Sequence, residues 1–194
     1  HYKFTVKRLQ DGSVDKFKCR LVADGNTQQH GLDFDRVFST VVKMSTVRLV
    51  LAIATARDYN LTSIDIRQAY LLATLSEDLY MMVPPGMPSR SDNGNPLVLK
   101  LNKSLYGLRQ AGREWNKLLV DFLLSWGFLQ SKIDVCMFTY TDQAKVLWLL
   151  VWVDDIIQAD NDSTLRDRFT ADLNKRFPTE DKGSLEWVLG VRVT

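Results

Sequence analysis

The chain has 194 residues, a formal net charge of +2 and 45% hydrophobic residues, a globular composition that excludes disordered and collagen-like chains. Its longest apolar run, residues 146–153, is far shorter than the ~20 residues of a membrane span, and no signal peptide is recognisable. Two cysteines and two histidines without metal-ligand spacing argue against a disulfide framework or a zinc ribbon. The chain opens at His1 in what reads as mid-strand, so we expect a piece of a longer polypeptide.

The first third of the chain predicts a hairpin, a helix and a strand. Residues 2–9 and 14–23 are β-rich, carry basic side chains and flank an Asp-Gly turn, which is a strong hairpin signal. Apolar positions recur at helical spacing over residues 45–59, with Ser45 as the expected N-cap. A short strand over residues 61–66 follows.

The rest of the chain alternates helices and strands without a βαβ rhythm. Residues 83–96 hold four of the five prolines and predict a loop. Apolar residues at i, i+3, i+4 and i+7 predict an amphipathic helix over residues 115–126, ended by Gly127. We therefore predict the α+β class. The remaining expected elements are strands at 97–101, 136–140 and 146–153, a helix at 163–177, and a strand pair at 185–193 bent at Gly190.

Charge is distributed unevenly along the chain. Residues 1–50 carry nine Lys and Arg against five Asp and Glu, whereas residues 136–194 carry seven against ten. A basic front and an acidic back would suit a protein that contacts polyanions at one end and holds cations at the other. On charge alone, chance variation between solvated faces is the simpler explanation.

Two adjacent aspartates, Asp154 and Asp155, interrupt the apolar run of residues 146–157. Carboxylates are rarely buried unless they are paired or bound to a metal, and two neighbouring like charges favour a divalent cation. At a tight turn between buried strands they would lie at the rim of a sheet. A solvated type I′ turn is the alternative interpretation.

Asp65 is a further carboxylate at the end of an expected strand, with an N-cap for residues 66–72 as the alternative. If the two strands are neighbours, the three carboxylates offer the hard oxygen ligands that Mg²⁺ prefers. Two such ions about 3.5–4 Å apart stabilise an in-line phosphoryl displacement, so the indicated chemistry is nucleotidyl transfer. No GxxxxGKS/T loop supports a P-loop NTPase.

An ordered set of motifs resembles the reverse transcriptase domain of Ty1/copia-type LTR retrotransposons nearly end to end. The segment SLYGLRQA upstream of Val-Asp-Asp is its most specific part. The matching stretches are KCRLVA at 18–23, GLDF at 31–34, IDIRQAY at 64–70, PPG at 84–86, KSLYGLRQA at 103–111, VDD at 153–155 and LG at 189–190.

The resemblance implies right-hand polymerase fingers and palm, with an antiparallel palm sheet, helices packed on one face and no thumb. Fingers would span about residues 1–60 and 70–115, interleaved with palm at about 61–70 and 116–194. The implied function is an RNA-directed DNA polymerase that adds dNTPs to a primer 3′ end by two-metal-ion chemistry.

By the same resemblance, two Mg²⁺ ions, or Mn²⁺ as substitute, would be held by the catalytic residues Asp65, Asp154 and Asp155 and by the backbone carbonyl of Ile66. Lys18 and Arg20 would clamp the nucleotide triphosphate. As bare residues, they would more often be solvated strand charges.

Further positions follow from the resemblance. Tyr70 would exclude a ribose 2′-hydroxyl, Gln110 would lie beneath the template and incoming nucleotide, and Leu189 and Gly190 would hold the primer end. The alternatives are a core tyrosine, an exposed helix-start glutamine and a plain turn. Departures such as Asp24, where the family has a basic residue, should weaken phosphate binding but remove no metal ligand.

The implied partners are an RNA or DNA template-primer, dNTPs and the remainder of a Pol polyprotein with its integrase and RNase H, and no membrane. The expected location is intracellular, in a cytoplasmic particle or the nucleus. Three alternatives stay open: an inert retrotransposon relic, a template-primer-binding module without turnover, and a different palm-type nucleotidyltransferase.

Overall fold

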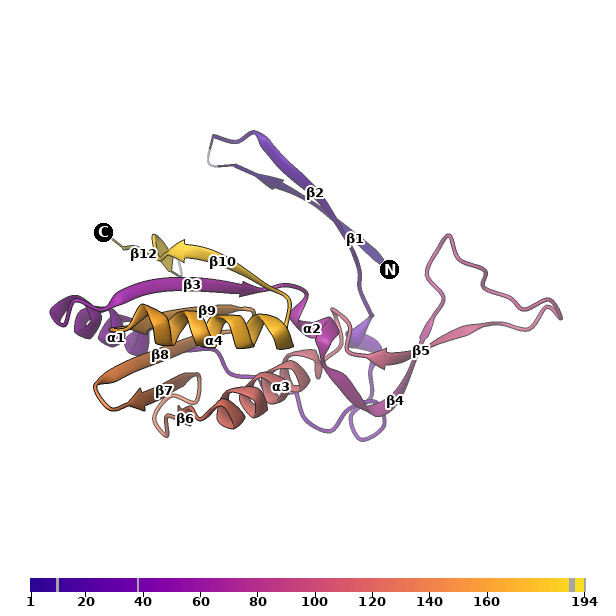
Figure 1. Cartoon of the computed structure of the whole chain (residues 1–194). Helices are drawn as coiled ribbons and strands as arrows, with labels where there is room; N and C mark the ends of the chain where they lie inside the picture. The colour runs from indigo at the N-terminus through magenta and orange to yellow at the C-terminus, as the bar shows by residue number, and fades with distance from the viewer. Residues whose placement is uncertain (10, 38, 189–190, 194) are drawn as a thin grey trace. The chain divides into compact units, whose positions relative to one another are not determined.

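The computed structural model describes residues 1–9, 11–37, 39–188 and 191–193 (Figure 1). Its Cα positions divide into two compact units, the first formed by residues 1–38 and 70–115 and the second by residues 39–69 and 116–194. Residues 39–60, which the sequence grouped with the fingers, fall in the second unit. Each unit contains antiparallel β structure, which confirms a mixed fold of strands and helices.

The first unit is built from two antiparallel strand pairs. The expected hairpin is present and turns through Gly12, whose φ of +85° only glycine adopts readily. The second pair includes a strand that was not predicted from the sequence, because its polar and apolar residues alternate only partly. The elements are β1 (Tyr2–Arg8) with β2 (Val14–Leu21), β4 (Thr74–Met82) with β5 (Val98–Lys103), and a 3₁₀ turn η1 (Gly25–Thr27).

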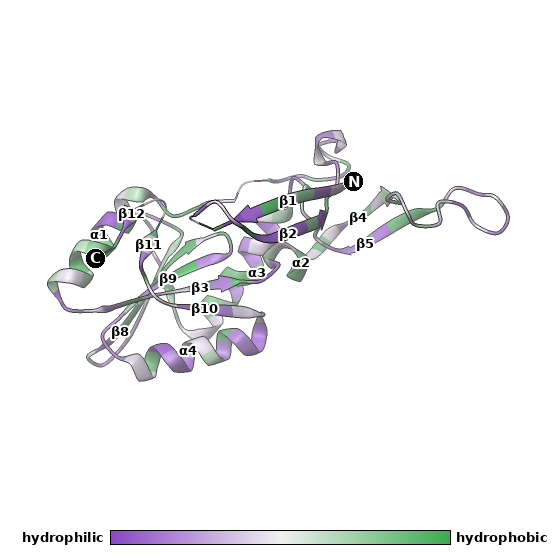
Figure 2. Cartoon of the chain, turned by 90° about the horizontal axis from the view of Figure 1, so that it is seen from above, coloured by the Kyte–Doolittle hydropathy of each residue, from purple (hydrophilic) through white to green (hydrophobic). Residues whose placement is uncertain are grey.

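The hairpin of β1 and β2 has one basic and one apolar face. Its register places Thr5 opposite Lys18 and Lys3 opposite Arg20, so the cations share a face. Phe4 and Phe17 belong to the other face. In Figure 2, purple (hydrophilic) and green (hydrophobic) residues both occur along these two strands.

The second unit contains a six-stranded antiparallel sheet in the order β10-β3-β9-β8-β7-β6. Its edge strand β10 was not predicted, because its sequence TEDKGS is polar and an edge strand is free to be so. The strands are β3 (Asn60–Ile66), β6 (Leu129–Gln130), β7 (Met137–Asp142), β8 (Lys145–Trp152), β9 (Asp155–Asp160) and β10 (Thr179–Ser184).

Helices cover both faces of this sheet, so the expectation of helices on one face is wrong. On one face, Val50 and Ala54 of α1 pack in a core with Ile157 of β9. On the other, Gln158 of β9 donates a hydrogen bond to Thr170 of α4, which Figure 1 shows along the sheet. Successive strand residues point to opposite faces, so adjacent residues of β9 contact different helices. The helices are α1 (Met44–Ala56), α2 (Ala69–Leu72), α3 (Ala111–Trp126) and α4 (Ser163–Arg176).

The start of α1 differs from the predicted one. The N-cap residue is Lys43 and not Ser45, and the Lys43 side chain forms no capping hydrogen bond. Instead, the Asp134 carboxylate accepts hydrogen bonds from the Lys43 amide at 2.9 Å and the Thr46 hydroxyl at 2.6 Å. Burial alone would raise the pKa of Asp134, but these hydrogen bonds, the Cys136 amide and the Lys43 charge outweigh it and lower that pKa. A residue 88 positions away thus caps the helix.

The two other long helices follow their local signals. Gly127 ends α3 with a φ of +108°, as predicted. In α4, Leu165, Phe169 and Leu173 are buried along one face, and the Asp162 side chain caps the Leu165 amide. The expected C-terminal pair is β11 (Trp187–Val188) with β12 (Val191–Arg192). Across the described ranges, no helix is long and apolar enough to cross a membrane.

Candidate active site

The two adjacent aspartates lie at a tight turn at the rim of the six-stranded sheet, as predicted. Trp152 of β8 pairs with Asp155 of β9, which leaves Val153 and Asp154 as the two turn residues. Leu149 and Val151 of β8 and Ile156 of β9 are buried. The apolar run therefore forms two central strands, and its carboxylates emerge at their junction.

The backbone of this turn differs from the type I′ alternative. A type I′ turn needs a positive φ at both central residues, and only the first, Val153, has one, at +57°. This φ pattern is that of a type II′ turn, whose first position favours glycine. A β-branched residue there is strained by about 1–3 kcal/mol.

We expect Val153→Gly to raise the free energy of unfolding by about 1 kcal/mol, since relief of strain exceeds the ~0.5–1 kcal/mol entropy cost of glycine. Urea unfolding followed by circular dichroism measures the change. The matched control is Gln143→Gly at the β7–β8 turn, where an unbranched residue has a φ of +55° and should gain less. Equal gains at both turns would contradict special strain at Val153.

Asp65 lies directly opposite Asp155 in the antiparallel pairing of β3 with β9. The Ile66 amide donates to the Asp154 carbonyl at 2.8 Å. Because hydrogen-bonded and non-hydrogen-bonded pairs alternate, this bond makes Asp65 and Asp155 a non-hydrogen-bonded pair, in which Cα atoms are only about 4.5 Å apart. The N-cap alternative for Asp65 is wrong, since the residue is inside β3 and the next helix begins at Ala69.

Opposed like charges destabilise a strand pair unless a cation lies between them. A third acid continues the row, since Glu180 of β10 is opposite Asp65 on its other side. Glu180 has its own cations: the Lys182 ammonium at 2.5 Å lowers its pKa, and Arg67 at 3.3 Å adds to the effect. No salt bridge to Asp65 is present among the residues that the structure describes.

The donor set fits a hard divalent cation. Within the described part of the chain, no group of three or more His, Cys, Asp or Glu residues is arranged as a ready-made metal cage. The geometry provides two opposed carboxylates, with a third next to one of them in the turn. Proteins commonly bind Mg²⁺ through one or two carboxylates, while waters and substrate phosphates complete its octahedral coordination.

The first unit carries the basic candidates. Burial and the positive charges of Lys7, Arg20 and Lys16 lower the pKa of Lys18. The Arg20 guanidinium lies 5.4 Å from the centre of the Tyr106 ring. Mutual repulsion within this basic face would be relieved by an anion, which is the property a phosphate-binding surface needs.

Tyr70 also belongs to the first unit and is half-buried. Its ring meets that of Tyr106 edge-on, with 5.2 Å between centroids. One aromatic pair therefore links the Tyr70 motif with the SLYGLRQA motif.

Gln110 is fully buried, so the exposed helix-start alternative is wrong. Its carbonyl oxygen accepts from the Gln28 amide at 3.0 Å, and its nitrogen donates to the Asp33 carbonyl at 2.8 Å. Both ends of the Gln110 amide are thus engaged within the first unit. Its role toward a nucleotide stays a prediction.

Residues 23–28 and 106–110 form a close contact between two loops, the loop interlock, which was not predicted from the sequence. The Ala23 amide donates to the Tyr106 carbonyl at 2.8 Å, and Arg109 Nε donates to the Gly25 carbonyl at 2.7 Å. A Cβ on Gly107 would lie 2.2 Å from the Ala23 oxygen. Gly25 and Gly107 were the available signal in the sequence, but a glycine does not identify the loop that approaches it.

The predicted site residues divide between the units. Asp65, Ile66, Asp154 and Asp155 lie in the second unit, where Asp65 is opposite Asp155 and Asp154 precedes Asp155 in the turn. Lys18, Arg20, Tyr70 and Gln110 lie in the first unit. Leu189 and Gly190, predicted to hold the primer, lie outside the described residues.

The chain belongs to the reverse transcriptase (RNA-dependent DNA polymerase) family, whose model matches residues 1–194. It is 40% identical over 188 residues to the retrovirus-related Pol polyprotein from transposon RE1 of Arabidopsis thaliana, and 37% identical over 189 residues to that from transposon RE2. It is 35% identical over 191 residues to the Pol polyprotein from transposon TNT 1-94 of Nicotiana tabacum.

These matches cover 97–98% of this chain but only 13–14% of each relative. They confirm the copia-type resemblance and correspond to one section of a Pol polyprotein. No solved structure matches the chain significantly.

Proposed function

We propose that this chain is the fingers and palm of an RNA-directed DNA polymerase that adds dNTPs to a primer 3′ end on an RNA or DNA template. The single observation that carries the proposal is the placement of Asp65 directly opposite Asp155, beside the Asp154 turn. Family membership alone would not distinguish an active site from a relic. The opposed carboxylates favour turnover, because a divalent cation bound between them would balance their like charges.

In this proposal Asp65, Asp154 and Asp155, with the Ile66 carbonyl, would hold two Mg²⁺ ions, for which Mn²⁺ could substitute. Bound there, the ions supply charge neutralisation and a lowered pKa for the primer hydroxyl. The carboxylates would orient the reacting groups, and the antiparallel pairing of β3 with β9 would hold the carboxylates in place. Positioning and electrostatics account for most of the catalysis in phosphoryl transfer.

The first unit would bind the nucleotide and the template. Lys18 and Arg20 share the basic face of the β1–β2 hairpin and would bind the triphosphate through charge-assisted hydrogen bonds. The same face would give sequence-independent affinity for a template-primer, weakening as salt rises. The remainder of a Pol polyprotein is the proposed covalent partner, and an intracellular particle or the nucleus the proposed location.

Primer extension on a homopolymeric RNA template tests the proposal. We expect dNTP incorporation that needs the complementary template and either Mg²⁺ or Mn²⁺. Binding of the template-primer without incorporation under any divalent-ion condition would instead support a binding module without turnover.

Replacing Tyr70 by alanine is expected to increase rNTP incorporation relative to dNTP by about 10–100-fold, since a steric pocket discriminates small groups by that factor. Single-nucleotide extension with matched dNTP and rNTP measures the ratio. The control is Tyr80→Ala, which removes an exposed tyrosine of β4 in the same unit. If wild-type protein already incorporates both sugars equally, the role of Tyr70 is refuted.

A further inference from the structure

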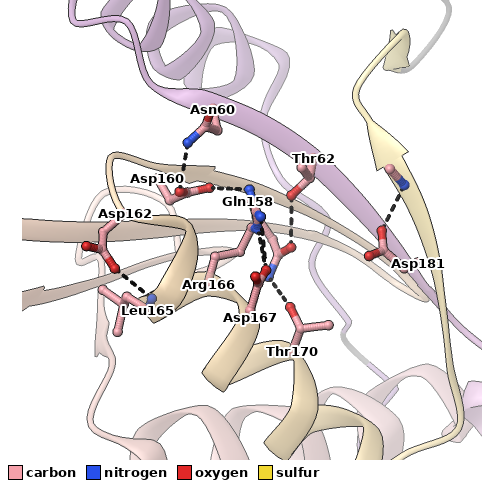
Figure 3. A network of polar contacts seen from close by, with 11 residues as sticks. Asn60, Thr62, Gln158, Asp160, Asp162, Leu165, Arg166, Asp167, Thr170 and Asp181 are labelled. Carbon is pink, nitrogen blue, oxygen red and sulfur yellow. Dashed lines mark hydrogen bonds and ion pairs between the residues drawn. The ribbon is translucent and has the colours of Figure 1, made fainter.

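Two polar pairs join β3 to β9 on the sheet face opposite to the aspartates (Figure 3). Thr62 donates to the Gln158 side-chain oxygen at 3.0 Å, and Asn60 donates to Asp160 Oδ1 at 3.1 Å. Both are directly opposed pairs in the strand register. They alternate with the site pair, since residues 60 and 62 face one way and Asp65 faces the other.

Helix α4 completes the hydrogen bonding of both pairs. Gln158 donates to the Thr170 hydroxyl at 3.3 Å, and Arg166 Nη1 lies 3.4 Å from Asp160 Oδ2. Gln158 is 1% exposed and Asp160 is fully buried, so water cannot replace these partners. In the view of Figure 3, the side chains of both strands converge above α4.

These contacts discriminate between strand registers. A shift of β3 by two residues keeps every side chain on its face, but the shift that sets Ser63 opposite Ala159 would place Ile64 opposite Gln158. The same shift would move Asp65 away from Asp155 and separate Thr62 from Gln158. Buried polar groups left without a partner are strongly unfavourable, so the polar pairs disfavour the shifted register.

We propose that Gln158 and Asp160, paired with Thr62 and Asn60, are positioning residues that hold β3 in the register placing Asp65 opposite Asp155. This inference rests on the proposed function for its consequence in catalysis. The register itself is a property of the fold and is testable without metal or substrate.

The test removes the polar pairing, first with a variant in which no partner of the replaced groups is left unpaired. The variant Thr62→Val/Gln158→Leu/Thr170→Val replaces one chain of hydrogen-bonding groups by apolar groups of similar shape, a change that can be nearly neutral for stability. A second variant adds Asn60→Ala, which weakens the other pair. The conservative variant Thr62→Ser keeps the hydroxyl group, so its crosslinking should match that of the wild-type protein. Thr62→Val alone is the milder variant, should the multiple substitutions unfold the protein.

Disulfide formation reports the register. In a Cys19→Ser background, Ser63→Cys with Ile157→Cys joins a native non-hydrogen-bonded pair, whereas Ser63→Cys with Ala159→Cys joins residues opposed only after a two-residue shift. Mass spectrometry after oxidation quantifies each crosslink. Loss of polar pairing should raise the shifted crosslink relative to the native one by about tenfold.

The matched control is Ile64→Val/Ile156→Val, which thins the buried apolar pair between the polar pairs and the site. It should lower stability and leave the native crosslink dominant, because the polar pairs are intact. If the polar variants crosslink as wild type does, the positioning role is overturned.

Mn²⁺ affinity, measured by electron paramagnetic resonance, connects register to site. In the polar variants it should fall about tenfold, in step with the native crosslink. Absence of Mn²⁺ binding in wild type would count against the proposed function alone, since crosslinking still reports the register.

Discussion

Replacing Asp65 or Asp154 by asparagine is expected to lower primer extension by at least about 10³-fold, because each carboxylate contributes several kcal/mol through charge stabilisation around bound metal. Without divalent ions, Asp65→Asn should at the same time raise the melting temperature. The reason is that Asp65 lies opposite Asp155, and removing one of two opposed like charges relieves repulsion. Loss of activity with gain of stability is the signature of a cation site.

Single-turnover extension at saturating Mg²⁺ measures the first effect, and thermal unfolding in EDTA measures the second. Asp142→Asn is the matched control, since Asp142 ends β7 at the opposite end of the sheet. It should leave both quantities near wild type. Unchanged activity in both site variants would refute the metal assignment, and a lower melting temperature would mean that Asp65 has a structural cation or donor.

The second large effect is expected from Gly107→Ala, which should destabilise the first unit by about 3 kcal/mol or more. A Cβ at residue 107 would meet the Ala23 oxygen at 2.2 Å and Val22 Cγ1 at 2.6 Å. The φ of Gly107 is also +94°, where a side chain is strained. The Ala23 oxygen cannot withdraw easily, because the Ala23 amide is bonded to the Tyr106 carbonyl.

Amide hydrogen exchange separates the two units in this experiment. In Gly107→Ala the Ala23 amide should lose protection, while amides of β8 and β9 in the second unit keep theirs. The control is Gly86→Ala, where φ is +91° but no atom lies within 4 Å of the added Cβ. It carries backbone strain without a clash and should cost about 1 kcal/mol. Equal losses at both glycines would show that the loop interlock contributes nothing.

Helix α4 and the hairpin of β1 and β2 illustrate what local pattern can predict. An Asp-Gly turn between alternating segments is sufficient for a hairpin, and three buried residues at helical spacing are sufficient for α4. These signals act within a few residues. The position of Asp154 at the rim of a sheet was predictable for the same reason, since charge within an apolar run is tolerated only where strands end.

The N-terminus of α1 and the buried Gln110 illustrate what local pattern cannot predict. Asp134 caps α1 through a hydrogen bond to Thr46, which lies 88 residues earlier in the chain. Gln110 forms a hydrogen bond with Gln28, which lies 82 residues earlier. Strand β10 has no apolar alternation, because its pairing with β3 depends on backbone hydrogen bonds at a sheet edge. Such contacts depend on which surfaces meet after folding.

By itself, the amino-acid sequence determined the reverse transcriptase family, the three candidate carboxylates and most helices and strands, because motifs and side-chain periodicity are local properties. The tertiary structure alone decided that Asp65 is opposite Asp155, that helices cover both faces of the sheet, and that Gln110 is enclosed. Strand register and burial depend on contacts between segments that are far apart in the sequence. These contacts form only when the chain has closed the loops between them, so local patterns do not reveal them.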